Sequence, residues 1–554
     1  MPIFPSEAWL EAYVEKLNSN TNYKAAAKDW EGDFLFIIEL DEAIKALIEE
    51  NLPDEAAKGL VGENIILYMD LWHGECRSAR VVGPSEDVKT AFTYAGPYVN
   101  WKGLIRKEIG PIKGLMQRKF RLTGNMAKVM LYVKAAQELV NSTTMVETLF
   151  IDEMELLEKE APKELKETWW FSSPEIAFGL EALNEIDELE GKRAFIISDN
   201  VMKELGFVDL IEEKFKTVEF EVKSFTEVKP EPSLQIVEQG AELAREFQPD
   251  WIVGVGGGSV LDVSKGVWVS YVRPDLPLDS LNPFVKLGLR EKARFLAIPT
   301  TSGTGSDASW AVVLTDTETK RKISLGSKEI IADKILLNPA FPAKMPPKLT
   351  ASTGIDALSH VVEGLTSKWA SDFSHGLCIR AIQLVFEYLP KTYENGTDML
   401  AREKMHNAAT LGGLAITNSQ VGMLHSMAHS LGAILELPHG QAIAAVMKTA
   451  MEYTMSQAEE EYANMAHAIG IWEKDSKVAG QKFIEKTTEL LESIGLVTNI
   501  KQLNISQEDF EANLDLLVDY ADGDQATVAS ARIPTADEFR KLFQYAYEGK
   551  SVDF

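Results

Sequence analysis

The pattern of the chain changes abruptly near residue 346, and this change limits what its last two thirds can fold into. Between residues 169 and 345, short apolar runs such as "DWIV" end in small or polar residues and alternate with amphipathic stretches such as "SLQIVEQGAELAREF". Such alternation is typical of a parallel sheet covered by helices. Beyond residue 346 the strand-like runs stop, and helical patterns continue nearly to the C-terminus. We expect an α/β domain followed by an all-α domain.

The first 150 residues are organised differently and are expected to form a small α+β domain. Two strand-like stretches, "GDFLFIIELD" and "NIILYMDLWHG", precede "NMAKVMLYVKAAQELV", whose apolar residues recur at helical spacing. The charged stretch "DEMELLEKEAPKELKE" predicts a helical or flexible connection. The expected boundaries are 1–150 for the first domain, 151–168 for the linker, 169–345 for the α/β domain and 346–554 for the helical domain.

Charge and cysteine content exclude several classes of function. The 554 residues carry a formal net charge of −28, which repels the phosphates of nucleic acids, so no nucleic-acid partner is expected. Cys76 and Cys378 lie far apart and suggest neither a disulfide framework nor a thiolate metal site. No apolar run is long enough for an integral membrane segment, and the N-terminus lacks a signal-peptide pattern. A cytoplasmic protein is the expectation.

A glycine-rich turn, "GVGGGSVLDVSKG", follows the apolar run "DWIV" directly. Glycines at the start of a helix let backbone N–H groups approach an anion such as a pyrophosphate. Glycine-rich turns between strand and helix are equally common for purely structural reasons, so this turn alone does not decide the function. The residues expected to face a pyrophosphate are Gly256, Gly257, Gly258 and Ser259.

Two further strand ends favour a nucleotide site. The loop "PTTSGTGSD" offers many small hydrogen-bond donors where open α/β sheets bind ligands. Its hydroxyl side chains are Thr300, Thr301, Ser302, Thr304 and Ser306. Asp199 ends the run "AFIISD", where a carboxylate can accept the hydroxyls of an adenosine ribose and repel a 2′-phosphate. This favours NAD over NADP, although Asp199 could also serve as the N-cap of the following helix.

Five side chains of metal-ligating type gather in two short segments. Asp356 and His360 are four residues apart in "IDALSH", and His425 and His429 repeat that spacing in "HSMAH", so each pair lies on one helix face. His439 follows in a proline-glycine turn. Imidazoles with a carboxylate suit a divalent transition metal with an open position. Since a four-coordinate protein site does not need all five, one histidine is expected to act on substrate or support a ligand.

These motifs, "GVGGGSVLDVSK", "AIPTTSGTGSD", "TGIDALSHVVEG" and "HSMAHSLGA" with "PHG" in this order, resemble the iron-containing (group III) alcohol dehydrogenases over residues 169–554. The resemblance implies a nucleotide-binding domain, a helical domain and a metal between them. The implied metal ligands are Asp356, His360, His425 and His439. His429 matches a non-ligand histidine near the substrate, here assigned to proton transfer. The implied cofactor contacts are Gly257, Gly258 and Ser259 for the pyrophosphate, Asp199 for the ribose, and Thr300, Thr301 and Lys322.

Two positions depart from the pattern of this family. Glu231 stands where members often have Asn, which leaves one cofactor contact open. Ile416 stands where some members have an aromatic residue, so an aliphatic wall could alter substrate shape preference. The resemblance favours Fe2+, and Zn2+ is the rival ion because a His3Asp set accepts both.

The first domain resembles the type 2 sterol carrier protein family over residues 20–145. The resemblance is carried by "WEGDFLFIIE", "YMDLWHGECRSARVV", "FTYAGPYVNWKGLI" and "GLMQRKFRLTGNMAKVMLYVKAAQELV". It implies a small domain with a hydrophobic tunnel for lipids or acyl chains. The apolar helix is equally typical of an ordinary core, because Met fills irregular gaps as readily as it lines tunnels.

Together the resemblances imply an NAD-dependent alcohol dehydrogenase or aldehyde reductase whose first domain presents long-chain, sterol-like or bulky hydrophobic substrates. The alternatives are a lipid-binding or transfer protein in which the dehydrogenase part is secondary, and a zinc-dependent polyol dehydrogenase. The first domain could also serve only assembly or docking to another protein. A homo-oligomer, most simply a dimer, is expected.

Overall fold

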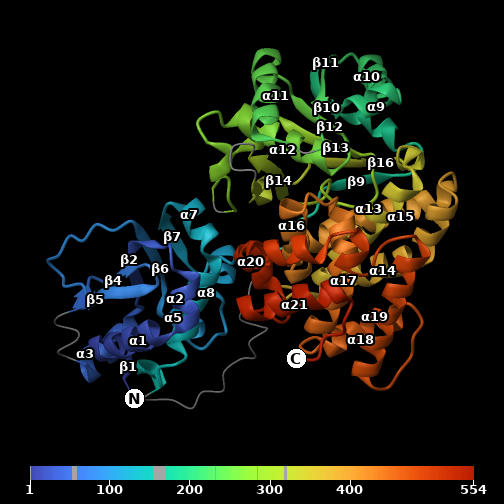
Figure 1. The fold of residues 1–554 in the computed structure, drawn as a ribbon. Coiled ribbons are helices and arrows are strands. Elements are labelled where there is room, and N and C mark those ends of the chain that lie inside the picture. The colour runs from blue at the N-terminus through green and yellow to red at the C-terminus, as the bar shows by residue number, and fades with distance from the viewer. Residues whose placement is uncertain (1, 53–58, 154–169, 231, 284, 317–320) are drawn as a thin grey trace. The chain divides into compact units, whose positions relative to one another are not determined.

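The chain divides into two compact units, Met1–Trp170 and Phe171–Phe554, in the computed structural model (Figure 1). The structure describes every residue except 1, 53–58, 154–169, 231, 284 and 317–320. Most of the expected connection "DEMELLEKEAPKELKE" therefore lies outside the described residues. No helix in the described part of the chain is long and apolar enough to cross a lipid bilayer.

The first unit is built on a mixed six-stranded sheet of order β3-β4-β2-β6-β7, with β5 paired to β4. The central β2 pairs antiparallel with β4 along nine residues and parallel with β6. The two strands expected in this region are confirmed by β2 and β4. The strands are β2 (Glu31–Glu39), β3 (Leu60–Val61), β4 (Asn64–Trp72), β5 (Glu75–Val81), β6 (Phe92–Pro97) and β7 (Arg121–Gly124).

Helices and a second, two-stranded sheet complete this unit. The expected helix over 125–140 is interrupted at Tyr132, whose φ is −119° and whose ring packs edge-on against Trp30. Asp152 pairs with Lys102 at 2.7 Å, so the packing of the unit continues past residue 150. The elements are α1 (Glu7–Ser19), α2 (Thr21–Ala26), α3 (Glu42–Asn51), α5 (Tyr98–Ile105), α6 (Pro111–Met116), α7 (Met126–Leu131), α8 (Val133–Thr143), and the paired strands β1 (Ile3–Phe4) and β8 (Leu149–Phe150).

The second unit begins with a parallel six-stranded sheet of order β11-β10-β12-β13-β16-β9. Because all its strands run parallel, their carboxyl ends lie on one edge. Its elements are β9 (Glu175–Phe178), β10 (Arg193–Asp199), α9 (Asn200–Glu204), α10 (Phe207–Thr217), β11 (Glu221–Val228), α11 (Leu234–Phe247), β12 (Trp251–Gly256), α12 (Gly258–Val272), β13 (Arg294–Pro299), the hairpin β14 (Ala311–Asp316) and β15 (Arg321–Gly326), and β16 (Lys334–Leu337).

Both faces of this sheet are buried, which explains why its strands read as continuous apolar runs. Phe195 and Ile197 of β10 share a core with α11 and α12. The alternate residues Ala194 and Ile196 pack with Phe215 of α10 on the opposite face. The expected parallel sheet between layers of helices is therefore confirmed.

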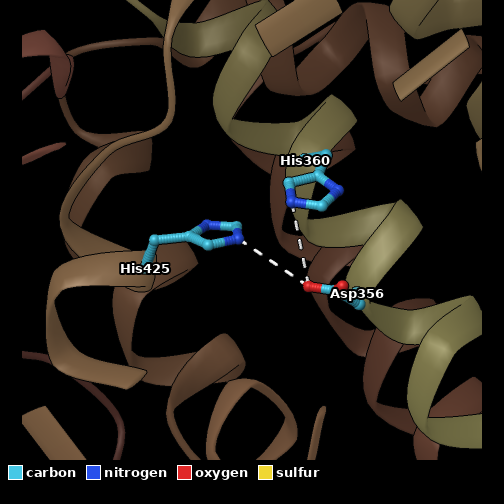
Figure 2. Close-up of side chains that lie close together, drawn as sticks. All are labelled: Asp356, His360 and His425. Carbon is cyan, nitrogen blue, oxygen red and sulfur yellow. Dashed lines mark ion pairs between the residues drawn. The ribbon is translucent and has the colours of Figure 1, made fainter. Parts of the chain in front are cut away.

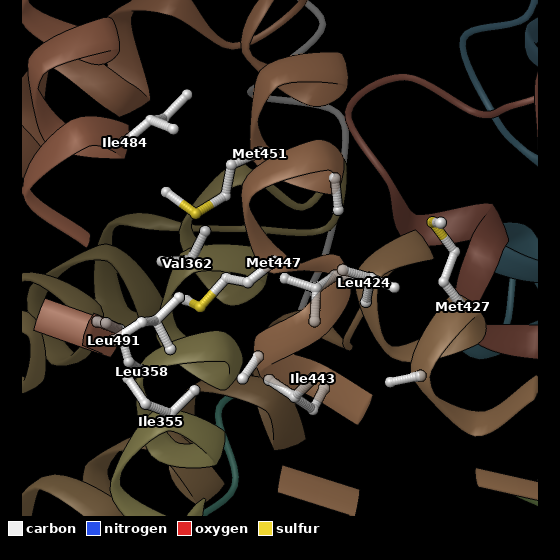
Figure 3. Packing of buried hydrophobic residues seen from close by; sticks show 14 of the residues in the cluster. Ile355, Leu358, Val362, Leu424, Met427, Ile443, Met447, Met451, Ile484 and Leu491 are labelled. Atoms are coloured by element: carbon white, nitrogen blue, oxygen red, sulfur yellow. The ribbon is translucent and has the colours of Figure 1, made fainter. Parts of the chain in front are cut away.

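Residues 346–554, all of which the structure describes, contain helices and no strand. The helices surround one apolar core in which α13 contributes Ile355 and Leu358 and α17 contributes Met447 and Met451 (Figure 3). The expected all-α character is confirmed. The helices are α13 (Pro347–Thr366), α14 (Asp372–Glu394), α15 (Met399–Ser419), α16 (Met423–Ile434), α17 (His439–Met455), α18 (Glu459–Ala468), α19 (Ser476–Ser493), α20 (Gln507–Gly523) and α21 (Ala536–Glu548).

Candidate active site

Four of the five side chains predicted as possible metal ligands lie together, with three imidazoles around one carboxylate oxygen of Asp356. Asp356 Oδ1 lies 3.8 Å from Nε2 of His360, one turn further along α13, and 3.8 Å from Nε2 of His425 on α16 (Figure 2). Nε2 of His439, the first residue of α17, lies 3.2 Å from the same oxygen. Two helices and a helix start thus bring together residues that are up to 83 positions apart, from Asp356 to His439.

The donor atoms fit a small divalent cation. Asp356 Oδ1 and His425 Nε2 are buried and have no hydrogen-bond partner among the described residues. With bonds of about 2.1 Å, a tetrahedral or octahedral cation separates neighbouring ligand atoms by about 3.0–3.4 Å. The observed 3.2–3.8 Å is close to this spacing. Buried polar atoms without partners are costly, and a bound cation would satisfy both atoms.

The electrostatics of the cluster favour a positive charge. Burial disfavours the ionised form of Asp356, yet the neighbouring His360 and His439 hold the pKa of its carboxyl well below the usual range. Burial lowers the pKa of the His360 imidazole to about 4, so this ring is neutral near neutral pH. A neutral imidazole beside an ionised carboxylate is the form in which both bind metals.

Glu363, for which the sequence predicted no role, contacts one imidazole of the cluster. Its Oε2 lies 2.5 Å from Nδ1 of His425, and its Oε1 accepts a hydrogen bond of 2.7 Å from the backbone N–H of Leu424. Burial opposes protonation of His425, but the nearby Glu363 and Asp356 raise its pKa to about 9. A carboxylate bound to Nδ1 fixes the imidazole so that Nε2 faces the cluster, as is common for metal-binding histidines.

His429 has a carboxylate partner of its own outside the cluster. Its Nδ1 lies 2.8 Å from Oδ2 of Asp524, whose Oδ1 accepts the backbone N–H of Ala526 at 2.8 Å. The His429 ring stacks on that of His439 with centroids 5.5 Å apart. His429 therefore lies beside the Asp356 cluster with its Nδ1 occupied, and Nε2 is left for another partner.

The three strand ends predicted to bind a nucleotide are neighbours in the sheet. Asp199, Gly256 and Pro299 end β10, β12 and β13, and these strands are adjacent and parallel. The backbone N–H of Thr300 donates to the carbonyl of Gly256 at 3.0 Å. Asp199 also caps α9 by accepting the N–H of Met202 at 2.9 Å, so the expected capping role is confirmed.

The glycine turn, Gly256–Gly258, packs closely against the loop Thr300–Ser306, here called the hydroxyl loop. The contact leaves little room for a side chain at the glycines. A Cβ on Gly257 would lie 3.1 Å from Cγ2 of Thr301, and a Cβ on Gly258 would lie 2.7 Å from Cγ2 of Thr304. α12 begins at Gly258, which directs free backbone N–H groups toward this edge. These contacts bring the predicted turn, Gly256–Gly258, and the hydroxyl loop together at the start of one helix. The free N–H groups of that helix start can bind an anion.

The remaining predicted cofactor residues differ in what they contact. The hydroxyl of Ser259 donates to the Pro230 carbonyl at 2.8 Å, whereas the buried Thr300 hydroxyl has no partner among the described residues. The side chain of Lys322, on β15, and all of Glu231 lie outside what the structure describes. Ile416 is half-buried on α15.

α15 holds the hydroxyl loop along one face. His406 Nδ1 lies 3.1 Å from the Ser302 hydroxyl. Further along that face, Thr410 donates to Asp307 at 2.7 Å, and Thr417 donates to the Ala308 carbonyl at 3.0 Å. The sheet edge and the helical part are thus joined directly. His406 is buried in this contact, and burial lowers its pKa to about 4.

A buried lysine anchors the same loop from the other side. Lys265 on α12 is fully buried and donates to the Ser306 hydroxyl and the Ser309 carbonyl at 3.1 and 3.0 Å. The Ser306 hydroxyl in turn donates to Asp262 at 2.5 Å. Burial lowers the pKa of Lys265 to about 8, although Asp262 opposes this shift.

The first unit contains an apolar pocket that is partly open to solvent, with about 700 Å³ of space between atoms when its open part is included. Trp30, Phe34, Phe36, Tyr94 and Trp101 form much of its wall. No acidic, basic or histidine side chain lines it in the described part of this unit.

One compact unit thus contains a cluster of side chains suited to a metal ion and a sheet edge suited to a nucleotide. This combination is typical of the class of metal-dependent dehydrogenases. Residues 173–339 match the iron-containing alcohol dehydrogenase family, and residues 350–547 match the C-terminal part of that family. The chain belongs to the iron-containing alcohol dehydrogenases, and it is an enzyme of that class. Residues 11–137 match the SCP-2 sterol transfer family, which confirms the resemblance of the first domain.

Individual relatives support this assignment. An NADPH-dependent butanol dehydrogenase of Clostridium saccharobutylicum is 37% identical over 382 residues, covering 69% of this chain and 98% of that protein. The structure of a 1,3-propanediol oxidoreductase superposes with a TM-score of 0.65 at 29% identity, covering 69% of this chain and 100% of that one. The iron-containing alcohol dehydrogenase of Thermococcus thioreducens gives 0.63 at 31% identity, with coverage of 69% and 100%.

Proposed function

We propose that the second unit interconverts alcohols and aldehydes with NAD, holding Fe2+ through Asp356, His360, His425 and His439. The convergence of three imidazole nitrogens on the unpartnered Asp356 Oδ1 carries this proposal. When bound, the cation supplies Lewis acidity at the alcohol oxygen, and the nicotinamide supplies the hydride acceptor. Zn2+ is the alternative ion, because the donor set accepts both.

Two carboxylates give the histidines of α16 different tasks in this proposal. Glu363 accepts the Nδ1 proton of His425 and thereby turns Nε2 of His425 toward the cluster. Asp524 accepts the Nδ1 proton of His429, so Nε2 of His429 can take a proton from the alcohol and return one to the aldehyde. His429 is about a quarter exposed, which allows it to pass that proton toward solvent.

Asp199 supports NAD as the cofactor in preference to NADP. A carboxylate at the end of this strand accepts ribose hydroxyls and repels a 2′-phosphate. The butanol dehydrogenase relative is NADPH-dependent. We infer that this chain has the opposite preference, for NAD, because its own carboxylate, Asp199, ends the strand beside the one that leads into the glycine turn.

Anaerobic purification tests the proposal for the second unit. We expect about one Fe2+ per chain and turnover of NAD with primary alcohols, with kcat/KM for NAD at least tenfold above that for NADP. The measurements are elemental analysis and nicotinamide absorbance across alcohols and aldehydes of graded chain length. Full metal occupancy without nicotinamide turnover on any of them would overturn the proposal.

For the first unit we propose that it holds a hydrophobic alcohol or aldehyde and presents it to the second. The apolar cavity supports this role, because it would bury the hydrocarbon part of a ligand. A ligand-transfer function independent of the dehydrogenase remains the second candidate, favoured by the match to a sterol transfer family. We also propose a cytoplasmic location, which agrees with two free buried cysteines, and a homodimer.

A further inference from the structure

Lys265, which is fully buried on α12, ties the hydroxyl loop to the helix whose start is suited to an anion. Its ammonium group donates to the Ser306 hydroxyl at 3.1 Å and to the carbonyls of Ser309 and Ala311 at 3.0 and 2.9 Å. Lys265 lies about two turns after Gly258, the first residue of α12. One helix therefore carries both the free N–H groups of its start and the group that holds the loop.

Two carboxylates act on Lys265 and join it to the surrounding elements. Asp262, one turn earlier on α12, lies 3.9 Å from Nζ of Lys265. Its two oxygens accept the Ser306 hydroxyl at 2.5 Å and a backbone N–H of β14 at 2.9 Å. Asp307, which follows the hydroxyl loop, accepts the Thr410 hydroxyl of α15 at 2.7 Å. A single buried charge thus lies where α12, β14 and the loop meet.

The contacts of Lys265 depend on its charge. An ammonium group has three N–H donors, which match the three acceptors Ser306, Ser309 and Ala311. A neutral amine has two donors and a lone pair, so it leaves one acceptor unsatisfied and loses the attraction of both carboxylates. Burial lowers the pKa of Lys265 to about 8, although both carboxylates oppose this shift. The loop is therefore held best below pH 8 and less well as the pH rises through this value.

We propose that Lys265 is a positioning residue for the nicotinamide cofactor: its charged form holds the hydroxyl loop against the start of α12, and this arrangement binds the cofactor tightly. Since Lys265 is fully buried, it acts through the loop and not by touching the cofactor. The inference rests on the proposed cofactor site and adds a residue that sets its affinity.

Binding of NADH to the full-length protein tests this inference without turnover. NADH fluorescence gives the dissociation constant from pH 7 to pH 9.5, once with Fe2+ under anaerobic conditions and once with a chelator. We expect a rise of about tenfold in both preparations, because the affinity falls with the fraction of charged Lys265. Constant affinity, or a rise in only one preparation, which would place the titrating group at the metal cluster, would overturn the role of Lys265.

The same titration separates this inference from the proposed function. No binding of NADH at any pH would contradict the cofactor site and this inference with it. Missing iron or missing turnover, with the pH-dependent rise intact, would contradict the dehydrogenase proposal alone and support the role of Lys265.

Lys265→Met and Lys292→Met form a matched pair of variants. Lys265→Met removes the charge and the donors, so NADH should bind about tenfold more weakly at pH 7, with no further change up to pH 9.5. Lys292 donates to the Tyr271 carbonyl at 3.0 Å, near the other end of α12, so Lys292→Met should keep the wild-type pH dependence. Wild-type pH dependence in a folded Lys265→Met protein would overturn the inference. If thermal unfolding shows that this variant does not fold, the titration of the wild-type protein decides.

Discussion

His425 and His429 lie one turn apart on α16, yet different carboxylates hold them. Glu363 binds His425 from α13, and Asp524 binds His429 from the segment after α20. Of these two histidines, His425 has its Nε2 within 3.8 Å of Asp356 Oδ1. At the scale of single residues, this difference supports the proposed division between a metal ligand, His425, and a group that moves protons, His429.

Replacement of each histidine by Asn should separate the two roles. His425→Asn removes a ligand atom, so we expect most of the bound iron to be lost, with metal affinity at least tenfold weaker. His429→Asn should retain iron but lower kcat by about 10²-fold or more, the usual contribution of a general base. Iron content and turnover of the same anaerobic preparations provide the measurements. Equal iron loss in both variants would contradict the division.

The sequence was informative about the residues of the Asp356 cluster and silent about the carboxylates that hold its histidines. Asp356 and His360 could be predicted as a pair because helical spacing of four places them on one face. Glu363 lies 62 positions from His425, and Asp524 lies 95 positions from His429. Acidic residues are abundant in this chain, so nothing local distinguishes these two. Only the packing of α13, α16 and α20 shows which acid meets which histidine.

Among the elements, α15 makes a contact that leaves no room for a side chain, because its backbone lies directly against the backbone of the hydroxyl loop. A Cβ added to Gly413 would lie only 2.2 Å from the carbonyl oxygen of Gly305, whereas a Cβ on the adjacent Gly412 would meet nothing closer than 3.5 Å. Gly413 shares its helix face with Thr410 and Thr417, which bond to the same loop. The position of the loop therefore depends on a glycine in a helix.

Gly413→Ala and Gly412→Ala form a matched pair for this contact. Alanine is favoured over glycine inside a helix by about 1 kcal/mol, so Gly412→Ala should be neutral or stabilising. Gly413→Ala must displace the loop, and we expect a lower melting temperature and a KM for NAD raised at least fivefold. Thermal unfolding and steady-state kinetics measure both effects. A Gly413→Ala enzyme that matched Gly412→Ala would show that the contact does not position the loop.

The types of the elements could be predicted better from the sequence than the order of the strands within the sheet. The buried apolar runs indicated a parallel sheet, since both faces of its strands are covered. The sequence did not show that β9, the first strand of the sheet, lies at its far edge beside β16, because that pairing joins residues near 175 to residues near 334. The interruption of the helix at Tyr132 was likewise missed, as its apolar spacing continues through the break.

At the scale of the whole molecule, one chain combines two candidate binding sites of opposite chemistry. The first unit has an apolar cavity, and the second has a polar cluster that favours a cation. The butanol dehydrogenase of Clostridium saccharobutylicum and the alcohol dehydrogenase of Thermococcus thioreducens are almost fully covered by the matched part of this chain, so a dehydrogenase of this kind exists without the first unit. The first unit is therefore an addition whose effect can be measured by removing it.

Removal of residues 1–170 should leave an active dehydrogenase with an altered preference for chain length. Tethering raises the local concentration of a ligand that the first unit holds, and only ligands with enough apolar surface are held. We expect kcat/KM for 1-decanol to fall at least tenfold in the shortened protein, while the value for ethanol changes less than twofold. Iron content and the KM for NAD, measured in both proteins, control for damage to the second unit. Equal losses for decanol and ethanol would contradict substrate presentation and favour a role of the first unit in assembly or in ligand transfer independent of the reaction.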